Sequence, residues 1–275
     1  FFSMNMETQT GTAYETRRPL RVLLWHWGRR GGGPRYTLEL ARALSARDDV
    51  DVALSLSKDC EIFKSFVEIG FARFDIHTYR NIRSALFTSI KLPIIRAAFW
   101  RFVRDKQIDV VVCTMSHLWN VPVLLGKPGF PPFISVLHDA VPHPGENFPF
   151  RFGLLRAEVK RSQAVITLTE HVQSIVCGQY PYPKDRTYVV PHGVFPYAKP
   201  RGPTAKGPVR LLFFGRILFY KGLDLLLEAH RLLRSRGIDV HLTIAGPGNI
   251  GPYRDSLKGL DHVFVDNRWI DEDGI

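Results

Sequence analysis

A buried apolar strand, a glycine-rich loop and an amphipathic helix follow one another twice in this chain, and this repeated unit constrains the fold most. The first unit has a strand over Arg21–Trp27, a loop over Gly28–Gly33 and a helix from Pro34 to about residue 47. The second unit begins with a strand over Val209–Phe214 and ends with a helix over Leu223–Ser235. Such units are typical of parallel sheets that are covered by helices.

Short apolar segments predict the remaining strands. Helix-period segments lie between several of them, and this alternation is typical of a doubly wound parallel sheet. The fold class predicted is α/β, with two Rossmann-like doubly wound parallel-sheet domains. The further strands are expected at Val50–Leu56, Phe74–Tyr79, Asp109–Thr114, Pro132–His138, Ala164–Thr169, Thr187–Pro191, Val240–Ala245 and His262–Asp266.

Proline and glycine divide the chain. Residues 195–208 are rich in both and lack an apolar period, so they are expected to link two domains. We expect a loose leader over residues 1–18, without the apolar core of an export signal, and a front domain over residues 19–194. Residues 209–275 are shorter than the roughly 100 residues usual for a domain, so the rear domain is expected to be incomplete.

The formal net charge of +11 is carried by the front of the chain, because basic and acidic residues balance from Pro208 onward. This asymmetry predicts an anionic partner for the front: a phosphorylated substrate, an acidic lipid or a nucleic acid. Nucleic acid has only the net charge in its favour, since no reader module is recognisable.

Cysteine content and hydropathy limit the cellular setting. The three cysteines are too few and too scattered for a disulfide framework or a zinc site. We therefore expect no bound metal, and we expect the protein to work in a reducing compartment. The longest weakly charged run, Val110–Gly126, falls short of the roughly 20 apolar residues that span a bilayer. The expected location is the cytoplasm, with peripheral binding to the inner face of a membrane as a further expectation.

The segment Gly31–Tyr36 stands where the first strand meets the first helix. Glycine amides at a helix N-terminus can bind an anion, which makes Gly32 and Gly33 candidate ligand-binding residues, with Arg35 beside them. The alternative is a plain tight turn. The segment Gly31–Tyr36 does not match the dinucleotide-binding fingerprint, because Tyr36 occupies the place of the third glycine.

Polar residues lie at and just after the carboxyl end of the predicted strand Pro132–His138. Ligands bind at this edge in open parallel sheets. His138 and Asp139 could contact substrate hydroxyls, while His143 and Glu146 could shape an acceptor pocket. The alternative is a proline-stiffened loop with capping side chains.

The loop Gly215–Gly222 opens the rear domain in the same position. Arg216 and Lys221 lie five residues apart beside glycines and a helix N-terminus, a combination that suits a diphosphate. Gly246 and Gly248 follow the next strand at the same edge. The alternatives are two solvated surface cations and a simple turn.

Together these motifs resemble the retaining family 4 glycosyltransferases of the GT-B fold, over about residues 20–275. The match is most specific from Phe213 to Gly248. The motifs that carry it are Gly31–Tyr36, His138–Asp139, Pro191–Val194, Gly215–Arg216, Lys221–Asp224 and Ala245–Gly248.

The resemblance implies a nucleotide-sugar donor held mostly by the rear domain and a glycan or lipid-linked acceptor held by the front. The glycines implied near the donor are Gly32, Gly33, Gly193, Gly215, Gly246 and Gly248, and the residues implied on the acceptor side are Arg35, Asp139, His143 and Glu146. Arg216 and Lys221 would bind the diphosphate and stabilise it as it leaves, in place of a metal ion. His138 would lie near the donor sugar. Retention would proceed by front-face substitution without a covalent enzyme nucleophile, and no cofactor is implied.

The sequence departs from the family pattern in two respects. His192 stands where many relatives have asparagine, and the Glu, seven residues, Glu signature of the donor site is not reached before Ile275. The alternative function is therefore a non-catalytic remnant, or a module that binds glycans or membranes.

The segment Asn81–Lys106 is basic and aromatic. It could rest on anionic lipid, or it could be a crossover helix that buries its aromatic face and solvates its cations. Its basic residues are Arg83, Lys91, Arg96, Arg101, Arg104 and Lys106, and its aromatic ones Phe87, Phe99, Trp100 and Phe102.

Overall fold

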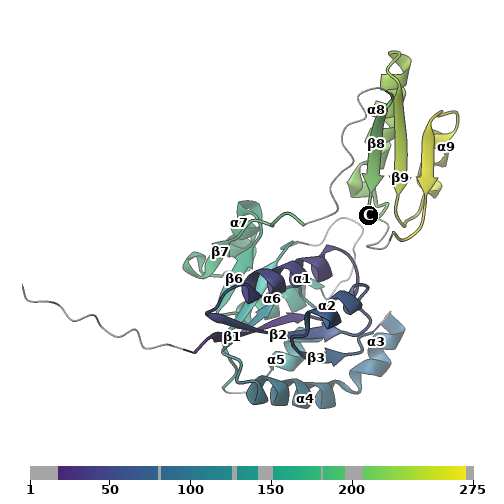
Figure 1. Ribbon diagram of the computed structural model, residues 1–275. Helices are drawn as coiled ribbons and strands as arrows, with labels where there is room; N and C mark the ends of the chain where they lie inside the picture. Colours follow the sequence, from purple (N-terminus) through teal and green to yellow (C-terminus); the bar gives the residue numbers. More distant parts are fainter. Residues whose placement is uncertain are drawn as a thin grey trace, which may run out of the picture.

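The computed structural model describes residues 18–79, 82–125, 129–141, 151–180, 182–195 and 207–270. Within these ranges the chain has two parallel sheets with helices between successive strands, as the sequence predicts (Figure 1). The larger sheet comprises β1 (Leu20–His26), β2 (Val50–Ser57), β3 (Ala72–Ile76), β4 (Val110–Cys113), β5 (Phe133–Leu137), β6 (Ala164–Thr167) and β7 (Thr187–Val189); the smaller comprises β8 (Val209–Phe214), β9 (Val240–Ala245) and β10 (Val263–Asp266).

The helices connect these strands in chain order, apart from short 3-10 turns. Those of the front are α1 (Gly32–Ser45), α2 (Phe63–Ile69), α3 (Ile82–Ser89), α4 (Leu92–Asp105), α5 (Asn120–Leu124), α6 (Arg151–Arg161) and α7 (Glu170–Gln179). Those of the rear are α8 (Leu223–Ser235) and α9 (Arg254–Leu257).

Strand order in the larger sheet is β3-β2-β1-β4-β5-β6-β7. The chain builds outward from β1 to β3, then returns to the other side of β1 and builds outward again. In register, Trp25 of β1 lies beside Ser55 of β2 and Cys113 of β4. The strand order reverses between β1 and β4, and in open parallel sheets ligands bind in the crevice at such a topological switch point, beyond the carboxyl ends of the strands.

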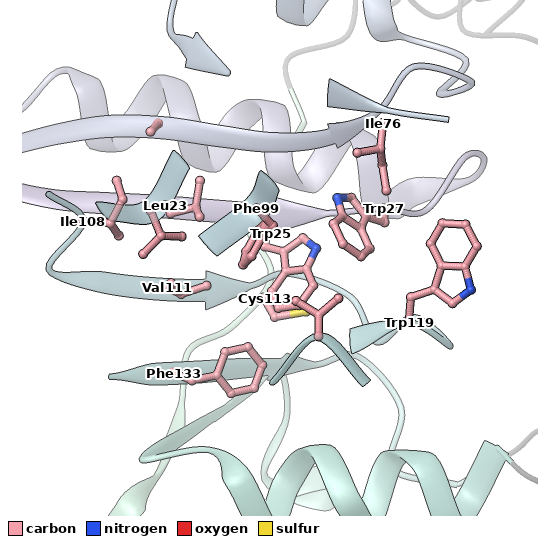
Figure 2. Packing of buried hydrophobic residues seen from close by; sticks show 13 residues of the cluster. Leu23, Trp25, Trp27, Ile76, Phe99, Ile108, Val111, Cys113, Trp119 and Phe133 are labelled. Carbon is pink, nitrogen blue, oxygen red and sulfur yellow. The ribbon is translucent and has the colours of Figure 1, made fainter. Parts of the chain in front are cut away.

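Both faces of the larger sheet are buried, because alternate residues of β1 point to opposite sides and nearly all are apolar. Leu23 and Trp25 pack with Phe99 of α4 on one face (Figure 2). Val22 and Leu24 pack with α1 and α2 on the other. Continuous apolar strands of this kind are typical of parallel sheets covered on both sides.

The smaller sheet has strand order β10-β9-β8 and one covered face in the part of the chain that the structure describes. Leu227 of α8 and Tyr253 pack with Leu242 and Ile244 of β9 on that face. On the other face Leu212 and Phe264 are 64% and 65% exposed.

All ten predicted strands are present, with small shifts in their ends. The third ends at Ile76 instead of Tyr79, and Thr78 beyond it lies 2.7 Å from the Ser57 hydroxyl. The first helix begins at Gly32, two residues before Pro34. Arg18, assigned to the leader, is anchored by two 2.7 Å bonds to Asp109.

Candidate functional site

The switch point between β1 and β4 brings together polar residues that are far apart in the sequence. His26 ends β1, Thr114 follows β4 and Thr37 lies in the second turn of α1. The Nδ1 atom of His26 lies 3.0 Å from the Thr114 hydroxyl, which lies 2.7 Å from the Thr37 hydroxyl. These three side chains form a continuous chain of hydrogen bonds beneath the first glycine loop.

One arrangement of protons satisfies this chain best. The Thr37 hydroxyl donates to the Gly33 carbonyl oxygen at 2.9 Å, so Thr114 must supply the proton shared with Thr37. Thr114 then accepts from the Nδ1–H of His26. The reverse order, with Thr37 donating to Thr114 and Thr114 donating to His26 Nδ1, also places one proton in each contact, but it gives up the bond from Thr37 to the Gly33 carbonyl. The arrangement that uses all three contacts has His26 as the Nδ1–H tautomer.

His26 is completely buried and neutral. Burial, with a further contribution from His138 and His117 nearby, lowers the pKa of His26 to about 3. Its Nε2 atom has no hydrogen-bond partner among the described residues. A Cβ atom at Gly28 would lie 2.7 Å from that nitrogen, and one at Gly33 would lie 2.8 Å from the ring. Glycine at both positions thus makes room for His26.

The N-terminus of α1 already holds one carboxylate. Glu61 accepts a hydrogen bond of 2.7 Å from the Gly31 amide, at the positive end of the helix. Gly32 faces open space, whereas Gly33 is packed against Met115 and His26. Arg35, a candidate on the acceptor side, pairs along the helix with Glu39 at 3.0 Å.

His138 stands beside the switch point, at the end of β5. Its Nε2 atom lies 3.1 Å from the Thr114 carbonyl oxygen, so this nitrogen carries the proton and Nδ1 is the acceptor of the neutral ring. Burial lowers the pKa of His138. Tyr36 packs edge-on against it at 5.1 Å, and Tyr36 also contacts His192 at 5.3 Å between ring centroids. Three aromatic side chains from separate elements therefore converge here.

The other candidates of the front lie around this group. Asp139 is exposed beside His138, and Gly193 is exposed with open space around its Cα. His143 and Glu146 lie outside the described residues.

A buried carboxylate supports the loop that follows β4. Glu158 of α6 accepts hydrogen bonds from Ser116 at 3.0 Å, from Ser135 at 3.1 Å and from Asn120 at 3.1 Å. Burial raises the pKa of Glu158, against the opposing effect of these donors. The network fixes the backbone between Thr114 and Asn120, which carries His117.

His117 lies at the same edge among aromatic rings. Its centroid is 5.0 Å from that of Tyr79 and 5.6 Å from that of Trp119. Its Nδ1 atom accepts from the Trp119 amide at 3.2 Å, and burial lowers its pKa. This packing holds a neutral imidazole close to the crevice.

In the rear sheet, glycines allow the loops after the strands to lie against one another. Gly215 and Gly246 have positive φ angles of 117° and 143°. A Cβ at Gly246 would overlap the Gly215 carbonyl, and one at Gly248 would lie 2.5 Å from the Ile217 carbonyl oxygen. The Ile217 amide in turn donates to the Pro247 carbonyl at 2.8 Å. These glycines build a compact layer of loops at the carboxyl edge.

Arg216 and Lys221 extend from this layer and are both exposed. The Lys221 ammonium lies 5.1 Å from the Tyr220 ring centroid. Gly222, with a φ of 71°, begins the 13-residue helix α8, whose first amides lack partners within the helix. Two cations and a helix N-terminus at one edge can bind an anion such as a diphosphate.

A cation–π contact connects the loops of the two sheets. The Arg30 guanidinium lies 5.1 Å from the centroid of the Trp269 ring, which follows β10. The carboxyl ends of β8 and β9 point toward the front sheet (Figure 1). Among the described residues, no cluster of His, Cys, Asp or Glu could hold a metal ion, and no helix could cross a membrane.

Two family models match adjacent parts of the chain. Residues 30–196 match the model described as Glycosyltransferase Family 4, which is more than half of the chain. Residues 197–263 match Glycosyl transferases group 1. Compared with individual curated proteins, the sequence matches none.

Solved structures share the fold at low sequence identity. Anabaena Alr3699/HepE, in complex with UDP and glucose, is 13% identical over 90% of this chain and 69% of its own, with a TM-score of 0.59. A glycosyltransferase from Rickettsia africae is 16% identical over 93% and 70%, with a TM-score of 0.61. A UDP-GlcNAc 2-epimerase from Neisseria meningitidis, bound to UDP-GlcNAc, is 13% identical over 90% and 72%, with a TM-score of 0.57.

Several residues of the crevice were not predicted from the sequence: His26, Thr37, Thr114, His117 and Glu158. His26 ends β1, and Thr114 and His117 follow β4 within four residues. This position at a strand end is the sequence signal that could have identified them as candidates. The contacts of Tyr36 with His138 and His192 join segments more than 50 residues apart, so no local pattern could indicate them.

Proposed function

Because this chain belongs to Glycosyltransferase Family 4, the family whose model matches residues 30–196, we propose that it moves a sugar from a nucleotide-sugar donor to a glycan or lipid-linked acceptor. The observation that carries the donor assignment is the rear edge, where Arg216 and Lys221 stand beside the N-terminus of α8. The reaction is assigned to the cytoplasm, where nucleotide-sugars would reach the site.

The rear loop supplies the charge that a departing diphosphate requires. Arg216 can bond two phosphate oxygens at once, whereas Lys221 acts as a mobile point charge. Amides of Leu223 and its neighbours at the N-terminus of α8 add a favourable dipole. In this proposal these groups stabilise the leaving group in place of a metal ion.

His138 acts on the sugar side in this proposal. Because its Nε2–H is bound to the Thr114 carbonyl, the neutral ring offers Nδ1 as an acceptor for a sugar hydroxyl. Tyr36 and His192 limit the positions of the ring by packing around it. We assign retention of configuration through front-face substitution, with no enzyme nucleophile.

Donor binding can be tested by titration calorimetry with UDP, the nucleotide seen in the HepE complex. Lys221→Ala should weaken binding by about 1.5–3 kcal/mol, which is the range of a charged hydrogen bond. The matched control is Lys258→Ala, since Lys258 is 78% exposed and pairs with Asp255 at 2.8 Å on α9. Equal affinity in the two variants would contradict the assigned role of Lys221.

Catalysis requires a separate assay with UDP-glucose and a panel of glycan and lipid-linked acceptors. Transfer that persists in a metal chelator, with the anomeric configuration of the donor kept in the product, would agree with the proposed mechanism. Transfer that a chelator abolishes would overturn the assignment of metal independence. Conversion of UDP-GlcNAc at C2 without transfer would favour epimerase chemistry on the same fold.

A non-catalytic binding module is the second candidate. The observation in its favour is a surface of exposed apolar and cationic side chains on α3 and α4, away from the rear loop. Binding of lipid or glycan without sugar transfer, for every donor tested, would support it.

A further inference from the structure

The corner between α3 and α4 exposes three large apolar side chains. Phe87 and Ile90 are each 75% exposed, and Ile94 is 73% exposed. Phe87 lies in α3, Ile90 in the turn between the two helices and Ile94 in the first turn of α4, so the three side chains stand within eight residues around the corner. Figure 1 shows α4 along the lower border of the front domain and α3 next to it at the right side.

This face is not required by the core. The opposite face of α4 contributes Phe99 and Val103 to the core, and the Trp100 indole donates to the Val123 carbonyl at 3.2 Å. The crossover-helix interpretation is thus correct for Phe99 and Trp100. It does not explain Phe87, because a solvent-facing helix position ordinarily carries a polar residue.

Cations continue the same outward face. Lys91, Arg101 and Arg104 are exposed, and none forms an ion pair with a described carboxylate. Arg96 is different, since it turns inward and donates to the Val123 and Leu125 carbonyls. No acidic residue occurs from Ile76 to Arg104. The free charge of this face is therefore positive.

We propose that the α3–α4 corner, defined by Phe87, Ile90 and Ile94 with Lys91 and Arg101, docks on an anionic lipid bilayer. Apolar side chains flanked by exposed cations fit a surface whose acyl chains lie just beneath negative headgroups. The charge is what selects this occupant, because a second copy of the chain would bring the same positive face.

The corner is connected to the candidate site. Ser89, the last residue of α3, accepts a 3.0 Å hydrogen bond from the Trp119 indole. Trp119 packs against Tyr79 and His117 at the carboxyl edge of the sheet. Docking would therefore bring this edge near the lipid surface and favour a lipid-linked acceptor. Only this last step rests on the proposed function.

The test is co-sedimentation with phosphatidylcholine vesicles that contain about one third phosphatidylglycerol, beside vesicles of phosphatidylcholine alone. We expect binding to the anionic vesicles only, and loss of that binding in high salt. The variant F87S/I90S/I94S should bind at least about tenfold more weakly. The variant K91E/R101E/R104E should not bind.

The matched control is L212S/L225S/F264S, which removes three apolar side chains that are 64%, 67% and 65% exposed on the rear part. It should sediment like the unchanged protein. Equal binding of the corner variant and this control, or equal binding to uncharged vesicles, would overturn the proposal. So would a dimer that F87S/I90S/I94S converts to monomer.

The affinity for UDP, measured on the same samples, separates the two proposals. Unchanged circular dichroism and urea unfolding of the corner variant show that loss of vesicle binding is not loss of the front fold, because UDP binding reports on the rear loop. Failure to bind UDP, with vesicle binding intact, would contradict the donor assignment and leave the docking surface standing.

Discussion

The two sheets have the same strand, loop and helix order but are buried to different extents. In the front sheet, β1 is covered on both faces, and Trp25 is 0% exposed. In the rear sheet, β8 is covered on one face, and its alternate residues Leu212 and Phe214 are 64% and 49% exposed. A shared order of elements therefore does not imply equal packing.

The difference separates stability from ligand binding. Apolar area removed from water is the main favourable contribution to folding, so the front sheet should dominate the stability of the described chain. The rear sheet contributes above all an edge of loops that glycine contacts hold in place. Substitutions in the two regions should consequently have different effects.

The largest contrast is expected between two aromatic residues. Trp25 packs against Trp27, Phe99 and Phe133, with centroids 4.8, 4.7 and 6.1 Å away. Trp25→Ala should lower the free energy of unfolding by about 3–5 kcal/mol, because it leaves a cavity in the core. Phe264→Ala, at an exposed position, should change it by less than about 0.5 kcal/mol.

Urea unfolding followed by far-ultraviolet circular dichroism measures both variants. A large loss of stability in Phe264→Ala would show that the outer face of the rear sheet is covered in solution. Similar losses in the two variants would abolish the contrast between the sheets.

A smaller effect is expected in the rear loops. Gly246→Ala should destabilise the rear sheet by about 1–3 kcal/mol, which is the cost of a strained backbone. The overlap of the new Cβ with the Gly215 carbonyl should increase this loss of stability. Gly193→Ala, where a Cβ meets open space, is the control. Proteolysis of the native protein measures opening of the loops. Equal protection in both variants would contradict a structural role for Gly246.

The last expected difference is a pH dependence of the stability of the front sheet, whose size is given per pH unit. Burial lowers the pKa of His26 to about 3, from the usual 6.5. As pH falls from 6.5 toward 3, the unfolded chain binds a proton that the folded protein does not, so the free energy of unfolding decreases by at most about 1.4 kcal/mol per pH unit. Above pH 6.5 this contribution is fully present.

His26→Gln should make that pH dependence weaker, because it removes the group whose pKa burial lowers. Stability measured by urea unfolding at pH values from 4 to 7 checks this. An unchanged slope in His26→Gln would mean that His26 is accessible to protons in the folded protein.

The order of strands and helices was predictable because it depends on local patterns. The apolar run at Val209–Phe214 and the glycines that follow it indicate a strand and a turn wherever they occur. The rear candidates Arg216 and Lys221 were predictable for the same reason, since they lie in one short loop. The linker and domain limits stay predictions.

The crevice of the front sheet was predictable only in part. His138 was identified from its place at the end of a strand. The bond of His26 to Thr114 depends on which strands are neighbours, and the sheet order that places β1 beside β4 is set by long-range packing. The function of Gly33 could not be read from the sequence either, because the contacts that require glycine come from Met115 and His26.

The central proposal is that the rear loop, beside the crevice of the front sheet, holds the diphosphate of a nucleotide-sugar. Amide hydrogen exchange with and without saturating UDP tests this most directly. We predict slower exchange in Gly215–Leu223 and Ala245–Gly248, and loss of that protection in Lys221→Ala. Protection confined to Gly28–Gly33 in the front domain, or no protection in either loop, would contradict it.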